Sequence, residues 1–309
     1  MSIGHTLQKV GFALWQWPKT LLPVKKPRLV MTLLVKNEAD ILAANLEFHH
    51  AMGVDGFIVT DNNSSDATMD ILRQYERRGW VWHIISEPAT GYLQKRWVDR
   101  MVWMAKRQYG ADWVINADAD EFWWPPTGNL KAGLDSTRAG VLHCRTVSVL
   151  PVEGQPLSAW EETVRAVKPE DEARYGLCPF SHYARQRGKV LHRTDGYLQI
   201  AQGNHKVLML PRVKRESDII IYHYSLRGKA HFISKMVTGG KAYEANPSKH
   251  GGRHWRYFYA LHKQGRLEQA YEESVMGCAH MAELRRDGYI VHDNPLPQWF
   301  ASHLHTHAE

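Results

Sequence analysis

The sequence predicts an α/β fold in which a mostly parallel β-sheet is flanked by helices and followed by a helical C-terminal extension. Apolar runs typical of strands buried on both faces alternate with segments of helical periodicity. Turns rich in glycine, asparagine and aspartate separate these segments. The 309 residues, 44% of them apolar and 23% charged, are enough to bury a core without disulfide or metal staples. Fibrous and wholly disordered classes are therefore excluded.

Expected strands and helices alternate strictly in the first half of the chain. Residues 29–35 read Leu-Val-Met-Thr-Leu-Leu-Val, an apolar run suited to a buried parallel strand. Ile41, Leu42, Leu46 and His49 then recur at helical spacing, as on the inward face of a helix, and Gly53 is expected to end that helix. The remaining elements are strands at residues 57–60, 80–85 and 113–117, a helix capped by Asp66 and ended by Gly79, and a helix over residues 92–109. This order gives right-handed crossovers and parallel strands.

The pattern is looser after residue 139. Strands are expected at residues 140–150, 189–192, 197–201, 206–210 and 218–224, and the polar stretch 151–175 is expected to be irregular. Residues 228–276 show the periodicity of two or three helices, whereas the tail from Gly277 has no clear pattern. The expected inward positions of these helices are Phe232, Met236, Tyr257, Leu261, Leu267 and Tyr271.

The charge of the chain favours an anionic partner. Its 39 lysines and arginines against 32 acidic residues give a formal net charge of +7. Phosphorylated small molecules, a membrane surface and nucleic acid all suit such a charge. Because the basic residues are dispersed and no RNA-binding or helix-turn-helix pattern is visible, we do not expect a nucleic-acid partner.

Cysteine usage and hydropathy bear on the compartment. Cys144, Cys178 and Cys278 are far apart and form no CxxC pair, which indicates a reducing compartment. No apolar run reaches about 18 residues and no signal-peptide pattern is present. We therefore expect a cytoplasmic protein. Residues 1–27 form a basic and aromatic N-terminal arm, which either contacts the inner face of a membrane peripherally or packs on its own domain.

Polar clusters follow three of the expected parallel strands. They are Lys36-Asn37-Glu38, the turn 61–66, and Asp118-Ala119-Asp120-Glu121. The ligand crevice of such a sheet lies at the carboxyl ends of its strands, so these clusters are expected to converge there. The period of two in a strand would send the carboxylates of Asp118 and Asp120 to the same side. Together they would bind a hard divalent cation, Mg or Mn, with the phosphates of a substrate completing its shell.

Four stretches resemble the GT-A glycosyltransferases, specifically family 2 and its neighbour with the Asn-Glu opening. They are residues 35–38, 53–55, 60–68 and 116–122. The resemblance implies an inverting enzyme with a nucleoside diphosphate sugar as donor, UDP being the most frequent nucleotide. It also implies a catalytic domain over 28–227, with a nucleotide-sugar half at 28–130 and an acceptor half at 131–227, before the helical extension at 228–309.

The resemblance also implies roles for individual residues. Lys36, Asn37, Glu38 and Asp61 match contacts to nucleobase and ribose, Lys95 or Arg96 matches a basic position beside the diphosphate, and Asp118 and Asp120 match the metal motif. Glu121 extends the acidic cluster. His205 and His223 look like downstream histidine motifs, one of which supplies a third metal ligand, and Arg227 and Lys235 follow His223 as phosphate contacts.

The catalytic base is not fixed by the sequence. Asp195, Glu153 and Glu161 are acidic candidates, and His205 stands beside Asp120 and Asp195 among the catalytic residues that we expect. Trp123 and Trp124 either stack on an acceptor sugar or fill the edge of the sheet. Trp80 and Trp82 are expected to be core residues.

The leading interpretation is a metal-dependent glycosyltransferase that adds a sugar to a surface glycan or to its lipid-linked precursor. One alternative is a sugar-nucleotide pyrophosphorylase, although Lys36-Asn37-Glu38 contains no glycine of the kind such enzymes place after the first strand. The other is a non-catalytic glycan-binding or nucleic-acid-binding protein of the same fold.

Overall fold

The computed structural model describes residues 24–88, 93–244 and 252–304, together with residues 11, 15 and 22. The described residues form two units. The first comprises residues 24–88, 93–146 and 187–221, and the second comprises 147–186, 222–244 and 252–304. Among these residues, no helix combines the length and the apolar character needed to cross a bilayer. The predicted arm at 1–27 lies almost wholly outside the described residues.

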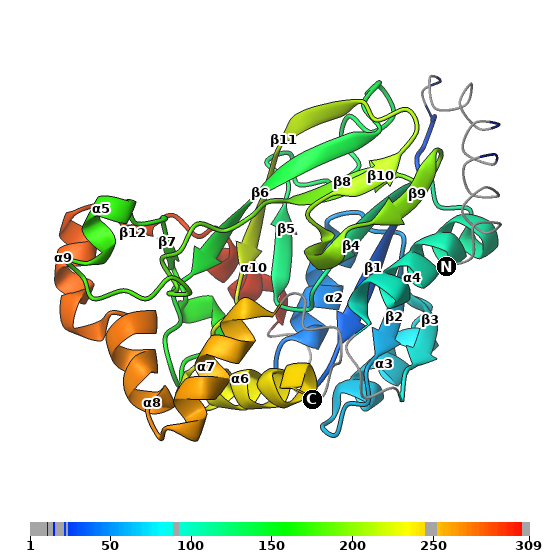
Figure 1. Cartoon of the computed structure of the whole chain (residues 1–309). Helices are drawn as coiled ribbons and strands as arrows, with labels where there is room; N and C mark the ends of the chain where they lie inside the picture. The colour runs from blue at the N-terminus through cyan, green and yellow to red at the C-terminus, as the bar shows by residue number, and fades with distance from the viewer. Residues whose placement is uncertain are drawn as a thin grey trace. The chain divides into compact units, whose positions relative to one another are not determined.

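A sheet with a parallel core organises the first unit (Figure 1). Its parallel strands are β1 (Leu29–Val35), β2 (Gly56–Asp61), β3 (Val81–Ser86) and β4 (Trp113–Ala117), in the order β3-β2-β1-β4. The next strand is β8 (Lys189–Arg193), which pairs antiparallel with β4, and β6 (Val141–Val149) then pairs antiparallel with β8. The predicted α/β class is confirmed, and the strands of the first half agree with their predicted positions to within two residues.

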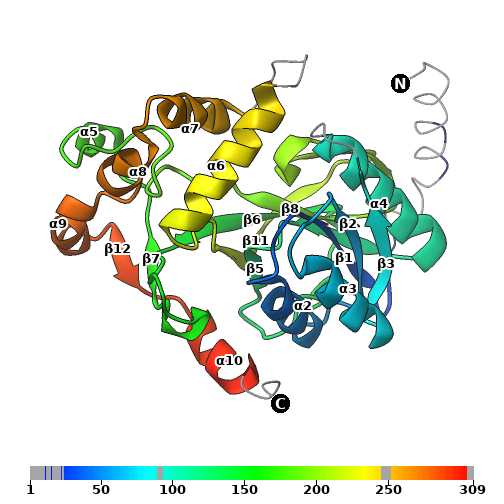
Figure 2. The same cartoon turned by 90° about the horizontal axis from the view of Figure 1, so that it is seen from below.

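Helices cover both faces of this sheet. The helix α4 (Gln94–Tyr109) lies on one face, and α2 (Leu42–Ala51) and α3 (Thr68–Arg77) lie on the other (Figure 2). Under α4, Val98, Met101 and Val102 pack with Val30 and Val114 of the sheet. The same core includes residues of β9 (Tyr197–Ile200) and β10 (Val207–Met209). Apolar side chains that alternate along the strands thus supply a core on each face.

The predicted ends of two helices are also observed. Gly53 and Gly79 follow α2 and α3 with φ angles of 96° and 77°, a conformation that glycine adopts without strain. Asp66 precedes α3, and its Oδ1 accepts the N–H of Thr68 at 3.0 Å. These local signals hold because each depends only on a few neighbouring residues.

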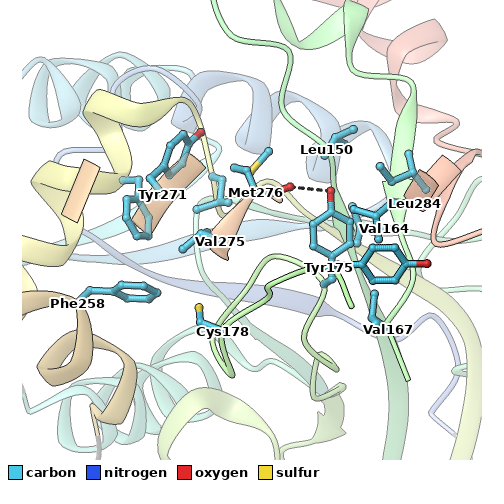
Figure 3. Close-up of a cluster of buried hydrophobic side chains, with 14 of the residues drawn as sticks. Leu150, Val164, Val167, Tyr175, Cys178, Phe258, Tyr271, Val275, Met276 and Leu284 are labelled. Carbon is cyan, nitrogen blue, oxygen red and sulfur yellow. Dashed lines mark hydrogen bonds between the residues drawn. The ribbon is translucent and has the colours of Figure 1, made fainter. Parts of the chain in front are cut away.

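The second unit surrounds its own core. Its strands are β7 (Glu162–Val164) and β12 (Ile290–His292), and β7 pairs antiparallel with both β12 and the end of β6. Buried residues from several elements, among them Tyr175, Phe258 and Tyr271, form the core (Figure 3). Its helical segments are Leu157–Ala159 (η1), Pro169–Glu172 (α5), Lys229–Glu244 (α6), Arg253–Lys263 (α7), Leu267–Ala270 (α8), Tyr271–Val275 (η3), Cys278–His280 (η4), Met281–Arg286 (α9) and Leu296–His303 (α10).

Several elements escape sequence-based prediction. They are β5 (Glu121–Trp124), β7, β12, α9 and α10, and the strand predicted at 218–224 is longer, as β11 (Lys214–His223). Elements this short carry no measurable periodicity, and the strands among them are fixed by pairing with distant segments. Of the six predicted inward residues, Tyr257 is wrong: it is 38% exposed, and the buried position is the next residue, Phe258.

Candidate functional site

The first two polar clusters meet at the carboxyl edge of β1 and β2. The side-chain Oδ1 of Asn37 accepts the N–H of Ser65 at 2.7 Å, and the backbone N–H of Asn37 donates to Ser64 Oγ at 2.9 Å. The N–H of Glu38 donates to Thr68 Oγ1 at 2.9 Å. Asn37 has a φ of 54°, a left-handed conformation in which asparagine is enriched. The two strand ends are therefore tied into one polar surface.

Two aspartates shape the turn after β2. Asp61 is 4% exposed, and its carboxylate accepts hydrogen bonds from the N–H and the Oγ–H of Ser64. Burial tends to raise the pKa of Asp66, but hydrogen bonds from Thr68 and Ala39 outweigh it and hold this pKa below its usual value. Both carboxylates are thus fixed by the loop that they cap.

Asp118-Ala119-Asp120-Glu121, here called the acidic motif, lies at the tight turn that joins β4 to β5. The N–H of Glu121 donates to the carbonyl of Asp118 at 3.2 Å. The side chain of Asp118 is 37% exposed, whereas Asp120 as a residue is 2% exposed. Strand periodicity does not extend to these two residues, because the strand ends at Ala117 and the turn begins there; that both carboxylates reach one ion stays a prediction.

A buried lysine contacts this motif. The Nζ of Lys189, the first residue of β8, lies 2.8 Å from Asp118 Oδ2 and 2.5 Å from Glu121 Oε1. Its side chain is 5% exposed, and that of Glu121 is 1% exposed. Burial alone would lower the pKa of Lys189, but the charges of Asp118 and Glu121 outweigh burial and raise it. Lys189 is therefore a permanent cation between two carboxylates.

The helix α2 holds the backbone of the motif through Asn45 and His49. The side-chain amide of Asn45 donates to the carbonyls of Ala119 at 2.8 Å and Glu121 at 2.9 Å, the residues on either side of Asp120. One helical turn on, His49 Nε2 accepts the N–H of Trp123 at 3.1 Å, while its Nδ1 lies 2.9 Å from the carbonyl of Asn45. Burial lowers the pKa of His49 to about 3, so the ring is neutral.

His205 belongs to the same unit and lies near the acidic motif. Its Nδ1 lies 3.0 Å from the carbonyl of Gly188, the residue before Lys189. Burial is the main cause that lowers the pKa of His205, and the charge of Lys189 lowers it further while that of Asp118 raises it. A donor Nδ1–H leaves Nε2 as the unprotonated nitrogen.

Asp195, the other predicted catalytic residue of this unit, is not brought to the motif. The strand β8 runs antiparallel to β4, and its last residue, Arg193, pairs with Trp113 at the start of β4. Asp195 follows at this opposite edge, where its carboxylate forms an ion pair with Lys106 at 3.2 Å. The carboxyl edge of β4 carries Lys189 in its place.

Glu153 and Glu161, the remaining candidates for the base, already have partners in the second unit. Glu153 Oε1 accepts the N–H of Lys229 at 3.2 Å, at the start of α6. Glu161 Oε2 lies 3.2 Å from His292 Nε2, and both side chains are more than half exposed.

His223, Arg227 and Lys235 also belong to the second unit. His223 ends β11 and is half-buried, as are Arg227 and Lys235. Among the described residues, no three His, Cys, Asp or Glu side chains gather in an arrangement that would hold a metal by themselves. The predicted contribution of His223 to a metal site with Asp118 and Asp120 stays a prediction.

The predicted basic and aromatic residues differ in exposure. Lys36 and Arg96 are exposed and Lys95 is half-buried, the last two in the first turn of α4. Trp123 is fully buried, so that packing is its role. Trp124 is half-buried and stacks on Phe48, with ring centroids 6.1 Å apart. Trp80 and Trp82, expected in the core, are half-buried and stack on His50 and Tyr109.

Sequence reasoning missed Lys189, Asn45 and His49 as functional residues. His49 was assigned to the inward face of α2, and Asn45, four residues earlier, is a polar residue on the same buried face. That spacing was the available signal. Lys189 opens an otherwise apolar strand segment, but its partners are 71 and 68 residues away, and no local pattern identifies them.

Comparison with known proteins gives one family match and several distant structural likenesses. The model of glycosyltransferase family 92 matches residues 30–227. The chain is similar to the mannosyltransferase PcManGT from Pyrobaculum calidifontis, with 14% identity, 97% of this chain and 89% of that chain covered, and a TM-score of 0.41. It is also similar to S. aureus TarS, with 14% identity, 79% of this chain and 73% of that chain covered, and a TM-score of 0.37. For glucosyl-3-phosphoglycerate synthase from Mycobacterium tuberculosis the identity is 14%, the coverage is 71% of this chain and 80% of that chain, and the TM-score is 0.36. No curated protein matches the sequence significantly.

Proposed function

The chain belongs to glycosyltransferase family 92 and is a glycosyltransferase, and we propose that it is a metal-dependent, inverting enzyme. In this proposal it transfers a sugar from a nucleoside diphosphate sugar, with UDP as the nucleotide, to a glycan or a lipid-linked glycan. The family that matches is 92, and membership of family 2 is not confirmed. Because the family is one of glycosyltransferases, neither the pyrophosphorylase nor the non-catalytic alternative is taken further.

One observation carries the proposal: polar residues from the ends of β1, β2 and β4 lie at one edge of a parallel sheet. The ligand crevice of an open α/β sheet lies at this edge. Asn37 is hydrogen-bonded to Ser65 in the turn that begins at Asp61. The strand β4, which pairs parallel with β1, is followed directly by the acidic motif. A nucleoside contacted by Lys36, Asn37, Glu38 and Asp61 would direct its diphosphate toward Lys95 and Arg96, which can donate charge-assisted hydrogen bonds, and toward an ion held by Asp118.

The acidic motif offers the oxygen ligands that magnesium and manganese prefer. These ions commonly take one or two carboxylates and complete their shell with water and substrate phosphates. Asp118 has a partly exposed carboxylate, which fits such a shared shell, and Asp120 would be the second protein ligand. The ion, when bound, supplies positive charge to the diphosphate leaving group.

We propose His205 as the general base. Inversion requires one displacement at the anomeric carbon, in which the acceptor hydroxyl loses its proton as it attacks. The Nδ1 of His205 is engaged by the Gly188 carbonyl, which leaves Nε2 to accept that proton. Asp120 then acts through the ion, whereas Asp195 lies at the other edge of the sheet.

The location and the acceptor are proposals that rest on the sequence alone. We propose a cytoplasmic enzyme that approaches the inner face of a membrane through residues 1–27, since a lipid-linked acceptor would be presented there. The roles of His223 as a metal ligand and of Arg227 and Lys235 as phosphate contacts stay predictions from the sequence. Nucleic acid is not a proposed partner.

Nucleotide binding tests the proposed site. Thermal unfolding of the full chain is measured with UDP, GDP or dTDP, with and without Mn²⁺. UDP with Mn²⁺ is expected to raise the melting temperature, because at about 100 times the dissociation constant a ligand stabilises the native state by about 2.7 kcal/mol. Asp118→Asn is expected to lose most of this stabilisation.

Asp135→Asn is the matched control, because Asp135 is an exposed aspartate in the same unit. It should respond to UDP and Mn²⁺ as the unaltered chain does. A protein that is stabilised equally with Asp118 intact and substituted would contradict the assignment of Asp118, and the absence of any response to the three nucleotides would contradict the proposed donor.

A further inference from the structure

Lys189 already supplies a positive charge to the acidic motif. Its ammonium lies between Asp118 Oδ2 and Glu121 Oε1, at 2.8 Å and 2.5 Å, and is nearly excluded from solvent. One of the two carboxylate oxygens of Asp118 therefore contacts the Lys189 ammonium, and the Asp118 side chain is 37% exposed. A divalent ion that binds Asp118 has to share this carboxylate with Lys189.

The strand that begins with Lys189 is paired on both sides. The strand β8 pairs with β4 on one side, and Lys189 itself is the register partner of Cys144 in β6 on the other. Gly188, just before it, packs so closely that an added Cβ would lie 2.4 Å from the carbonyl oxygen of Cys144. Glu121, at 1% exposure, depends on the ammonium for its own charge compensation. The lysine is thus built into the motif.

Two positive charges at the motif repel each other. This repulsion acts in a partly desolvated place, where charge interactions are stronger than in bulk water. Lys189 therefore weakens the attraction that the carboxylates of the motif exert on an incoming divalent ion. The diphosphate of a donor would change this balance, because its oxygens are anionic ligands for the same ion.

We propose that Lys189 is a resident counter-cation that makes the free protein a weak site for divalent ions, so that the ion binds together with the diphosphate of the donor. The inference rests on the proposed function, since it takes the acidic motif as the metal site. Lys189 is in this view a positioning residue, which orients Asp118 and makes the metal complex of the nucleotide the species recognised.

Binding of Mn²⁺ without nucleotide tests the proposal. Titration calorimetry on the full chain compares the unaltered protein with Lys189→Met. The substitution is expected to raise the affinity for Mn²⁺ alone at least tenfold, and Mn²⁺ alone should raise the melting temperature of this variant more than that of the unaltered protein. The unaltered protein should bind Mn²⁺ at least tenfold more tightly when UDP is present.

Two further variants serve as controls for this experiment. Lys189→Met leaves Glu121 buried without its cation, so Lys189→Met with Glu121→Gln tests the same gain in a protein that keeps no unpaired charge at that position. Lys131→Met breaks the 2.7 Å ion pair with Asp55 at the opposite edge of the unit and should leave Mn²⁺ affinity unchanged.

An unchanged or lower Mn²⁺ affinity in both Lys189 variants would overturn the inference, and so would a gain of equal size in Lys131→Met. These outcomes are independent of the donor. If no nucleotide binds while the Lys189 variants still gain Mn²⁺ affinity, the proposed donor fails and the counter-cation role stands. If UDP binds with Mn²⁺ but the variants show no gain, the counter-cation role fails and the proposed function stands.

Discussion

Lowering the pH from 6.5 to 4.5 is expected to destabilise the protein by about 6 kcal/mol, because three buried histidines must remain neutral in the folded state. His49, His182 and His192 are each at most 4% exposed. Burial lowers the pKa of His49 to about 3 and the pKa values of His182 and His192 to about 4, from an ordinary value of 6.5. The expected loss is comparable to the whole stability of an ordinary domain.

The sign follows from the protons bound in each state. Between pH 6.5 and pH 4 the unfolded chain protonates these histidines and the folded chain does not, so acid favours unfolding. Each histidine contributes about 1.4 kcal/mol per pH unit well below pH 6.5, or about 2 kcal/mol over the stated interval. Paired carboxylates such as Glu162, whose pKa is lowered mainly by its hydrogen bonds from Arg285, add to the loss only in more acidic solution.

In two of these rings, hydrogen bonds add to the effect of burial in opposing protonation. His192 Nε2 accepts from the side-chain amide of Asn116, and its Nδ1 donates to the carbonyl of Arg193. Protonation of Nε2 would direct an N–H at the amide hydrogens of Asn116. The amide is held in this orientation because its Oδ1 accepts a hydrogen bond from Thr32. The same conflict would arise between protonated His49 and the N–H of Trp123.

Urea unfolding at several pH values between 7 and 4.5 measures the effect. His192→Gln removes one titrating group and should reduce the loss of unfolding free energy between pH 6.5 and pH 4.5 by about 2 kcal/mol, whatever it does to stability at pH 7. Gln298→Ala, at an exposed residue that does not titrate, is the control and should leave the pH dependence unchanged. An equal slope in all three proteins would contradict the assignment.

The elements that the sequence predicted correctly are those determined by nearby residues. The β1-α2-β2-α3-β3 order follows from apolar runs, helical spacing and the turns at Gly53 and Gly79, and right-handed crossovers then bring the ends of β1, β2 and β4 to one edge. The convergence of Asn37 with the turn after Asp61 could be predicted for this reason.

The part of the site that was mispredicted depends on strand direction and on a single turn. Strand periodicity ends at Ala117, so it could not predict that Asp118 is partly exposed while Asp120 is buried. Asp195 lies at the wrong edge because β8 runs antiparallel to β4, and the same direction brings Lys189 to the acidic motif. No local pattern reports the direction of a strand that pairs across a long sequence separation.

Replacing Asn45 with alanine is expected to cost about 2–5 kcal/mol of stability and to weaken nucleotide binding at least tenfold. Two hydrogen bonds to the buried segment around Asp120 would be lost, and a buried polar group left without its partner costs about 1–3 kcal/mol. His49 would also lose its contact with Asn45 Oδ1, 3.1 Å away, while keeping the backbone carbonyl of the same residue. The turn between β4 and β5 would then be held less firmly.

Two measurements separate a positioning role of Asn45 from a purely structural one. Urea unfolding gives the loss of stability, and titration with UDP and Mn²⁺, at a temperature where the variant is fully folded, gives the change in affinity. Asn129→Ala removes an exposed asparagine whose Oδ1 accepts the N–H of Lys131 in a turn near Gly53, and it should change the affinity less than twofold. If Asn45→Ala is destabilised but binds UDP and Mn²⁺ with unchanged affinity, the amide supports only the fold. A loss of affinity confined to Asn45→Ala would instead indicate that α2 positions Asp120. The carboxylate of Asp120 would reach the ion only while Asn45 holds the carbonyls of Ala119 and Glu121 in place.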